Sequence, residues 1–200
     1  MRAFSNYKAE KAAAREPLPA GGYVARILNA EVVTYKGRDE DYEKLVISFE
    51  ISEGPYKDFF QKDYDAQTGE DRKWRGVLRL NVPVDDGSER DGWSKRSFGN
   101  AMWAVEASNP GYHWDWNEAG LRGKTVGVLY RGREWEMTDS QGEYRTGWTT
   151  ECCAFESVDT IREGGFKMPK DKPLKKSPQP AIPQETQLSQ EEKRHLPWET

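Results

Sequence analysis

Apolar residues recur at every second position along several segments of this chain. In the clearest segment Leu45, Ile47, Phe49 and Ile51 alternate with smaller or polar residues. A period of two places neighbouring side chains on opposite faces of a strand, so the pattern predicts a strand with one buried face. The predicted strands are 23–34, 45–51, 56–64 with its continuation 74–82, 121–136 and 143–158.

One segment follows the helical period instead. Its apolar residues lie at i, i+3, i+4 and i+7 and are Phe98, Ala101, Met102 and Val105. This spacing predicts an amphipathic helix that Ser94 or Ser97 caps and that ends at 109–111 (Asn-Pro-Gly).

The predicted order is three strands, one helix and a hairpin that turns around 139–142. This β-β-β-α-β-β order is typical of a five-stranded OB-like barrel, a mostly β fold. Small SH3-like barrels and β-sandwiches use short strands at similar spacing. The single helix between the third and fourth strands favours the OB-like barrel, which is the fold that we predict.

The two ends differ from the body in composition. Residues 1–17 form an N-terminal extension whose stretch 6–15 has helix formers but no long apolar stripe, and we expect a marginal helix there. Residues 167–200 hold six of the eleven prolines and too little apolar surface to offset the entropy of ordering, so we expect a disordered tail. The compact domain is therefore predicted to span 18–166. No long apolar run and no signal-peptide stretch occur, so we expect a cytoplasmic protein.

The charge balance limits how this chain can meet nucleic acid. The net charge is -4, with 23 Lys and Arg against 29 Asp and Glu up to Phe166 and 7 against 5 after it. An acidic body cannot bind nucleic acid through bulk positive charge, so any such site must be a local patch.

Residues for catalysis or metal binding are few. Cys152 and Cys153 are neighbours in a predicted strand, where they point to opposite faces and do not bridge easily. His113 and His195 are far apart in the sequence, and they do not form a zinc-ligand set with the cysteines. No carboxylate pair, nucleophile with a base, or phosphate-binding glycine loop stands out, so we expect neither an enzyme nor a bound cofactor. A sugar-binding or enzymatic β domain that uses its tryptophans for stacking is the least favoured alternative.

Several segments resemble a family of small proteins encoded by phages and prophages of Gram-positive bacteria. They are 18–27 (LPAGGYVARI), 45–60 (LVISFEISEGPYKDFF), 73–88 (KWRGVLRLNVPVDDGS), 121–135 (LRGKTVGVLYRGREW) and 157–170 (SVDTIREGGFKMPK). Members of that family are regarded as replication or recombination proteins with an OB-like fold that bind single-stranded DNA. The resemblance implies this class of function and fixes no binding residue.

Binding of single strands without sequence preference needs aromatic faces, worth about 1–3 kcal/mol per base, interleaved with Lys and Arg for the phosphates. An OB groove is formed by strands two and three and walled by the loops after strands one and four. The residues with this interleaving, which are the candidate DNA-binding residues, are Tyr35, Lys36, Arg38, Phe60, Lys62, Tyr64, Arg75, Arg79, Arg131, Arg133, Trp135, Tyr144, Arg145 and Trp148.

Structural roles compete with DNA binding for several of these residues and their neighbours. Adjacent strand residues point opposite ways, and we assign Phe59 inward and Phe60 outward. Acidic residues in the predicted hairpin leave open that its charges are only a solvated face. Five tryptophans are expected to fill the core or plug loops, and these are Trp74, Trp93, Trp103, Trp114 and Trp116.

The tail carries two further features. Its lysines at 167–176 suit either nonspecific phosphate contacts or a soluble linker. The end, Leu196-Pro197-Trp198, is similar to the acidic Pro-aromatic tips by which bacterial single-strand-binding proteins recruit partners, although Lys193 and Arg194 dilute its charge.

The predicted function is thus a sequence-tolerant single-stranded-DNA-binding protein of phage replication or recombination. Its tail would recruit replication or recombination proteins, and an oligomer is compatible with the sequence. The alternative is a protein-interaction module that captures a host or phage replication factor, and the acidic body supports it.

Overall fold

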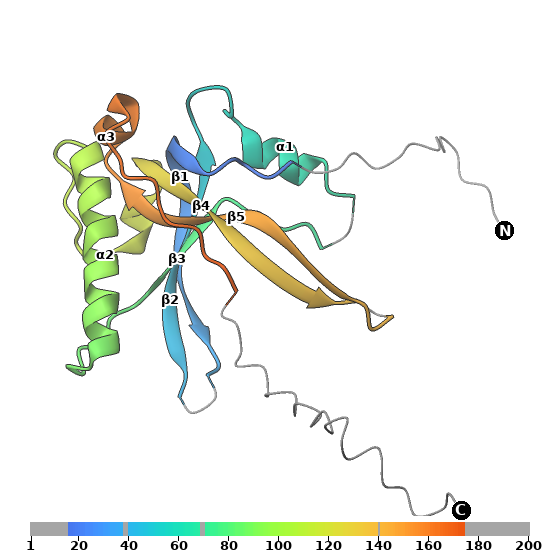
Figure 1. Ribbon diagram of the computed structural model, residues 1–200. Coiled ribbons are helices and arrows are strands. Elements are labelled where there is room, and N and C mark those ends of the chain that lie inside the picture. Colours follow the sequence, from blue (N-terminus) through green and yellow to red (C-terminus); the bar gives the residue numbers. More distant parts are fainter. Residues whose placement is uncertain (1–15, 38–39, 69–70, 140, 175–200) are drawn as a thin grey trace, which may run out of the picture.

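One five-stranded antiparallel sheet organises the chain (Figure 1). A computed structural model describes residues 16–37, 40–68, 71–139 and 141–174. The strands are β1 (Gly21–Tyr35), β2 (Tyr42–Ile51), β3 (Val77–Asn81), β4 (Thr125–Thr138) and β5 (Tyr144–Glu156). Their order in the sheet is β3-β2-β1-β4-β5, which confirms a mostly β fold. The predicted N-terminal helix lies outside the described residues.

Strand β2 supplies the centre of the core, as its alternation predicts. Leu45, Ile47, Phe49 and Ile51 are at most 1% exposed, whereas the residues between them are half-buried. β2 pairs with β3 in a register that sets Leu45 beside Leu80 and Ile47 beside Leu78. The apolar faces of the two strands therefore form one continuous surface.

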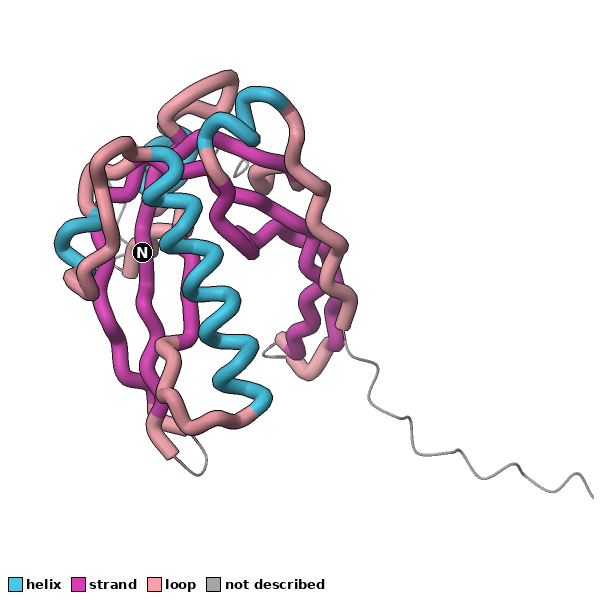
Figure 2. Tube along the Cα trace, turned by 90° about the vertical axis from the view of Figure 1, so that its left-hand side faces the viewer, coloured by secondary structure: helices cyan, strands magenta, loops and turns pink. Residues whose placement is uncertain are grey.

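Helix α2 (Glu89–Ser108) packs against the sheet and buries the predicted apolar stripe (Figures 1 and 2). It begins earlier than expected, because Ser88 is the cap and its Oγ accepts from the Asp91 amide at 3.1 Å. The prediction of Ser94 or Ser97 as the cap is wrong, because both residues lie inside the helix. Asn109 ends the helix as predicted and bonds the backbone of Thr125 at 2.7 and 3.0 Å, which joins the helix end to β4.

The predicted strand over 56–64 is wrong, because helix α1 (Phe59–Asp65) occupies this segment. Glu50 of β2 accepts from the Phe60 amide at 3.0 Å and the Gln61 amide at 2.6 Å, which satisfies two free donors of the first turn. Burial raises the pKa of this carboxyl. The helix turns Phe60 into the core at 3% exposed and leaves Phe59 half-buried, so the predicted orientations are reversed.

Two short helices shorten the predicted last strands. The 3-10 helix η1 (Glu118–Leu121) precedes β4, and α3 (Val158–Glu163) follows β5. Each has a polar cap, since Asn117 Oδ1 accepts from Ala119 at 3.1 Å and Ser157 Oγ accepts from Thr160 at 3.2 Å. No described helix has both the length and the apolar character to cross a membrane.

Three of the five tryptophans expected in the core or in loop plugs are largely exposed. Trp93, Trp103 and Trp116 are 66%, 58% and 74% exposed. Trp74 does plug the core edge, where its Nε1 donates to the Phe49 carbonyl at 3.1 Å. The exposed side chains therefore require another explanation than core packing.

The sheet does not close into the expected barrel. Within the described residues β3 pairs only with β2, and β5 pairs only with β4, so β3 and β5 are the two edges of this sheet. Register shifts at Ile27/Asn29 in β1 and at Leu129/Tyr130 in β4 mark bulges, which bend and twist strands. β3 and β5 approach each other without a ladder between them.

The chain continues along the sheet beyond the predicted domain end at Phe166. Lys172 donates to the Gly132 carbonyl at 2.8 Å and accepts from the Glu134 amide at 3.0 Å. These bonds form a short parallel bridge on the edge of β4 that β1 no longer covers. Residues 171–174 thus belong with the sheet rather than with a separate tail.

We predict that Phe60→Ala destabilises the protein far more than Phe59→Ala. Removing the buried ring should lower the free energy of unfolding by about 3–5 kcal/mol. Loss of the half-buried Phe59 should cost about 1 kcal/mol. Urea unfolding followed by circular dichroism measures both, and equal losses would contradict the assigned orientations.

Candidate nucleic-acid interface

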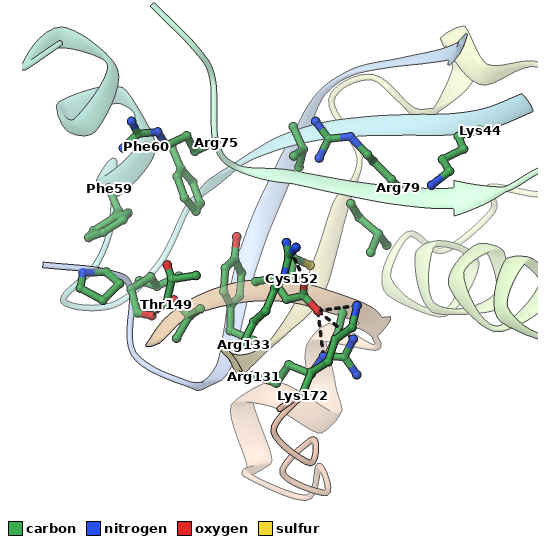
Figure 3. A pocket seen from close by; sticks show the side chains of 18 residues that line it. Lys44, Phe59, Phe60, Arg75, Arg79, Arg131, Arg133, Thr149, Cys152 and Lys172 are labelled. Atoms are coloured by element: carbon green, nitrogen blue, oxygen red, sulfur yellow. Dashed lines mark hydrogen bonds and ion pairs between the residues drawn. The ribbon is translucent and has the colours of Figure 1, made fainter. Parts of the chain in front are cut away.

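A groove of about 520 Å³ lies between the two edges of the sheet (Figure 3). We call it the cationic slot. One wall is formed by β3 and the residues just before it, including Arg75. The other wall is formed by β4, β5 and Lys172 of the segment 171–174. The lining residues of the slot are Pro17, Leu18, Lys44, Phe59, Phe60, Arg75, Val77, Leu78, Arg79, Tyr130, Arg131, Arg133, Thr149, Thr150, Glu151, Cys152, Cys153 and Lys172.

Positive charge dominates this lining. Its basic side chains are Lys44, Arg75, Arg79, Arg131, Arg133 and Lys172, and its one acidic side chain is Glu151. Alternation along β3 turns Leu78 and Leu80 into the core and leaves Arg79 exposed, as predicted. In Figure 3, Lys44 and Arg79 lie on one side of the slot and Arg131, Arg133 and Lys172 on the other. A chain of net charge -4 thus places six of its 30 Lys and Arg residues around one groove.

Glu151 holds three of these cations together. Its Oε1 lies 2.8 Å from Arg131 Nη2 and 3.7 Å from Lys172 Nζ, and its Oε2 lies 3.4 Å from Arg133 Nη1. The Glu151 side chain is 23% exposed. One carboxylate leaves a net positive charge on this cluster. Arg79 has no ion pair with any residue that the structure describes.

Aromatic side chains lie in and near the slot. Phe59 is one of its lining residues. The rings of Tyr35 and Tyr42 stack at 5.6 Å, and their centroids lie 5.7 and 5.4 Å from Nζ of Lys44, which lines the slot. Tyr35 and Tyr42 do not themselves line the slot, so a role of Tyr35 in DNA binding stays a prediction.

Tyr130 brings a polar group to the slot without a partner. The residue is 3% exposed, and its ring stacks on Phe60 at 6.3 Å. Its hydroxyl is buried and bonds no atom of the described residues. Burial raises the pKa of this hydroxyl, so it stays protonated and able to donate. A ligand acceptor would satisfy it.

Two predicted residues on α1 lie away from the slot lining. Lys62 donates to the Lys57 carbonyl at 3.1 Å. The ring centroids of Tyr64 and Trp74 lie 5.9 Å apart, and Cζ of Arg72 lies 4.8 Å from the Tyr64 centroid. Because the segment is helical, the predicted strand face shared by Phe60, Lys62 and Tyr64 is wrong. A role of Lys62 and Tyr64 in DNA binding stays a prediction.

The β4–β5 hairpin divides its predicted residues between two faces. Arg131, Arg133 and Trp135 share one face, as predicted, opposite Glu151, Thr149 and Gly147. A Cβ at Gly147 would lie 2.6 Å from the Trp135 ring, so this glycine makes room for it.

Tyr144 and Trp148 lie on the other face, opposite Thr138 and Glu134. The Tyr144 hydroxyl donates to Glu136. Arg145 shares the Trp135 face but is paired with Asp139 and Glu143 at 3.1 Å each. In the outer half of the hairpin, two acidic side chains therefore compensate the charge of Arg145.

Of the remaining predicted residues, the structure describes only Lys36. Lys36 is exposed next to Tyr35. Arg38 and the recruitment sequence Leu196, Pro197 and Trp198 lie outside the described residues.

Lys172 joins the slot through contacts that no local pattern reveals. Asp171 Oδ1 accepts from the Gly132 amide at 2.9 Å, and a Cβ at Gly132 would lie 2.6 Å from that oxygen. Glycine at this position therefore permits the approach of 171–172. The lysines at 167–176 stand out in the sequence, but the sequence does not indicate that Lys172 packs beside β4.

Other chemistry is sparse in the described part of the chain. No group of three or more His, Cys, Asp and Glu side chains there is placed to hold a metal ion. Cys152 and Cys153 are both free, and burial raises the pKa of each thiol. These thiols are thus poor nucleophiles at neutral pH.

We predict that Asp171→Ala releases the short bridge at β4. The amide of Glu134, which donates to Lys172, should then exchange with solvent at least about tenfold faster, because a hydrogen-bonded position opens more often. Lys170→Ala, at an exposed neighbour, is the matched control. Hydrogen exchange by mass spectrometry measures this, and unchanged exchange near 132–134 in Asp171→Ala would contradict the bridge.

No protein-family model matches this chain, and no curated protein sequence matches it. The function of the cationic slot is therefore inferred from its own geometry and charge.

Proposed function

We propose that this protein binds single-stranded DNA, without sequence preference, in phage DNA replication or recombination. The observation that carries the proposal is the cationic slot, whose lining includes six basic side chains and one carboxylate in a chain that is acidic overall. Outside the lining, Asp63 pairs with one of the six, Arg75, at 3.4 Å. The resemblance of several segments to phage-encoded single-strand-binding proteins supports the biological setting.

The strand order supports a finer description of the fold. The order β3-β2-β1-β4-β5, with α2 between β3 and β4, is the order of an OB-like barrel that remains open between β3 and β5. In that fold, nucleic acids bind over strands two and three and the neighbouring loops. The cationic slot lies beside β3, so its position agrees with this mode of binding.

The slot would hold DNA by charge and stacking, without turnover. Arg79, Arg131 and Arg133 would contact phosphates and release counterions, which makes binding strongly salt-dependent. Tyr35, Tyr42 and Phe59 would stack on bases at the two ends. The Tyr130 hydroxyl would donate to a phosphate or base acceptor. None of these contacts requires a particular base.

A protein-interaction module is the second candidate, and one observation favours it. β3 and β5 are both edge strands, and an exposed edge can add an extended peptide strand. An acidic peptide of a host or phage replication factor would suit the basic lining. In either case Leu196, Pro197 and Trp198 are proposed to recruit replication or recombination proteins.

The first test is fluorescence anisotropy of labelled oligo-dT at two salt concentrations. Arg79→Ala and Arg133→Ala should each weaken binding roughly 3- to 10-fold and reduce the slope of log K against log salt by about 0.7. Lys62→Ala, a control cation outside the slot, should change neither. No binding at low salt, or binding indifferent to salt, would reject the DNA-binding proposal.

A second test uses Glu151, which occupies the cations that a phosphate would need. Glu151→Gln should raise the affinity for oligo-dT roughly 3- to 10-fold, because it removes a competing anion from Arg131, Arg133 and Lys172. Glu143→Gln, which removes the same charge beside Arg145, is the matched control. If Glu151→Gln binds no more tightly than Glu143→Gln, DNA does not contact this cluster.

A further inference from the structure

The last described residues of the chain, 171–174, lie along one wall of the cationic slot, and we call them the strap. β1 pairs with β4 as far as Tyr130. The strap takes over this edge of β4 directly beyond that point, at Gly132 and Glu134. A segment from far along the chain therefore contributes Lys172 to the lining of the slot.

Hydrogen bonds to two residues of β4 hold the strap. Lys172 donates to the Gly132 carbonyl at 2.8 Å and accepts from the Glu134 amide at 3.0 Å. Asp171 Oδ1 accepts from the Gly132 amide at 2.9 Å, and the Leu174 amide donates to Glu134 Oε2 at 3.0 Å. These bonds fix the backbone of Lys172, so they decide where its side chain enters the slot.

The strap buries little of its own surface. Asp171, Lys172 and Pro173 are exposed, and Leu174 is half-buried. A segment with exposed backbone hydrogen bonds and few buried apolar contacts opens at a low cost in free energy. A ligand that binds only to the docked strap would therefore change how often the strap opens.

The Lys172 ammonium is the least tightly held of the three cations around Glu151. Its Nζ lies 3.7 Å from Glu151 Oε1, an oxygen that already accepts from Arg131 Nε at 3.1 Å and Nη2 at 2.8 Å. The Lys172 side chain is 55% exposed, and in Figure 3 it lies beside Arg131 and Arg133. A phosphate that binds these two arginines would therefore attract Lys172 as well.

We propose that the docked strap presents Lys172 to a phosphate of single-stranded DNA, and that the bound strand in turn locks the strap on β4. This coupling rests on the proposed binding of DNA in the cationic slot. Because the Lys172 contact forms only when the strap is docked, the strand and the strap stabilise each other by the same factor. Occupancy of the slot thus controls the position of Leu174, from which the rest of the chain continues.

Asp171 distinguishes this coupling from simple attraction between charges. Its carboxylate is a negative charge next to Lys172, so its removal should strengthen DNA binding if net charge alone mattered. If the strap acts as proposed, Asp171→Ala should instead weaken binding, because the bond to Gly132 is lost and Lys172 leaves the slot. Asp171→Asn keeps an oxygen that accepts from the Gly132 amide, so it should bind at least as tightly as the unaltered protein.

Fluorescence anisotropy of labelled oligo-dT on the full chain measures these affinities. Asp171→Ala and Lys172→Ala should each weaken binding roughly 3- to 10-fold, and the double variant should bind no more weakly than Lys172→Ala. Gly132→Ala should resemble Asp171→Ala, because its Cβ would lie 2.6 Å from Asp171 Oδ1. If Asp171→Ala binds as tightly as Asp171→Asn, the strap does not position Lys172 and the proposal is overturned.

Hydrogen exchange on the unaltered protein tests the reverse direction and needs no variant. Saturating oligo-dT should slow exchange of the Glu134 amide by about the factor that Asp171→Ala loses in affinity, roughly 3- to 10-fold. In Lys172→Ala this slowing should disappear, whereas equal slowing would mean that DNA covers β4 directly. Binding of oligo-dT without the slowing, or with equal slowing in Lys172→Ala, overturns the coupling and leaves the DNA-binding proposal standing. No binding at low salt rejects both.

Discussion

Packing around Phe49 is the interaction on which both walls of the cationic slot depend. The ring is fully buried at the centre of β2 and meets Phe60 of α1, Tyr130 of β4 and Phe155 of β5 at 5.9, 6.5 and 6.0 Å. These three rings come from elements on either side of the open edge. Phe49 therefore holds α1 and the base of the β4–β5 hairpin at a fixed separation, although no ladder joins β3 to β5. The slot exists because aromatic packing replaces strand pairing at this point.

Electrostatics sets what kind of ligand the cationic slot can hold. Strand alternation and the bridge at Gly132 bring together cations from distant parts of the chain. One carboxylate, that of Glu151, compensates three of these cations only in part. A chain that is acidic overall therefore keeps a local cationic surface, which favours an anionic ligand.

The helix α1 shows how a tertiary contact overrides a local pattern. Its two adjacent phenylalanines were assigned as if they stood in a strand, yet Tyr56, Phe60 and Tyr64 also follow a helical spacing of four. The carboxylate of Glu50, brought by β2, accepts from the free amides of the first turn and so favours the helix. The local sequence pattern does not include that acceptor, because Glu50 belongs to another element. In this helix Phe60 is buried, and Lys62 and Tyr64 are not among the residues that line the slot.

The sequence by itself determined the elements whose stability is local or periodic. Alternation identified β2 and the exposed face of β3, the helical period identified α2, and the position of Arg131, Arg133 and Trp135 on one face followed from strand geometry. Only the tertiary structure decided which of these faces meet. The register of β4 with β5 set Tyr144 and Trp148 on the opposite face, and Gly132 admitted Lys172 to the slot. The physical reason is that a repeat along the chain fixes the direction of a side chain, whereas pairing between distant strands fixes its neighbours.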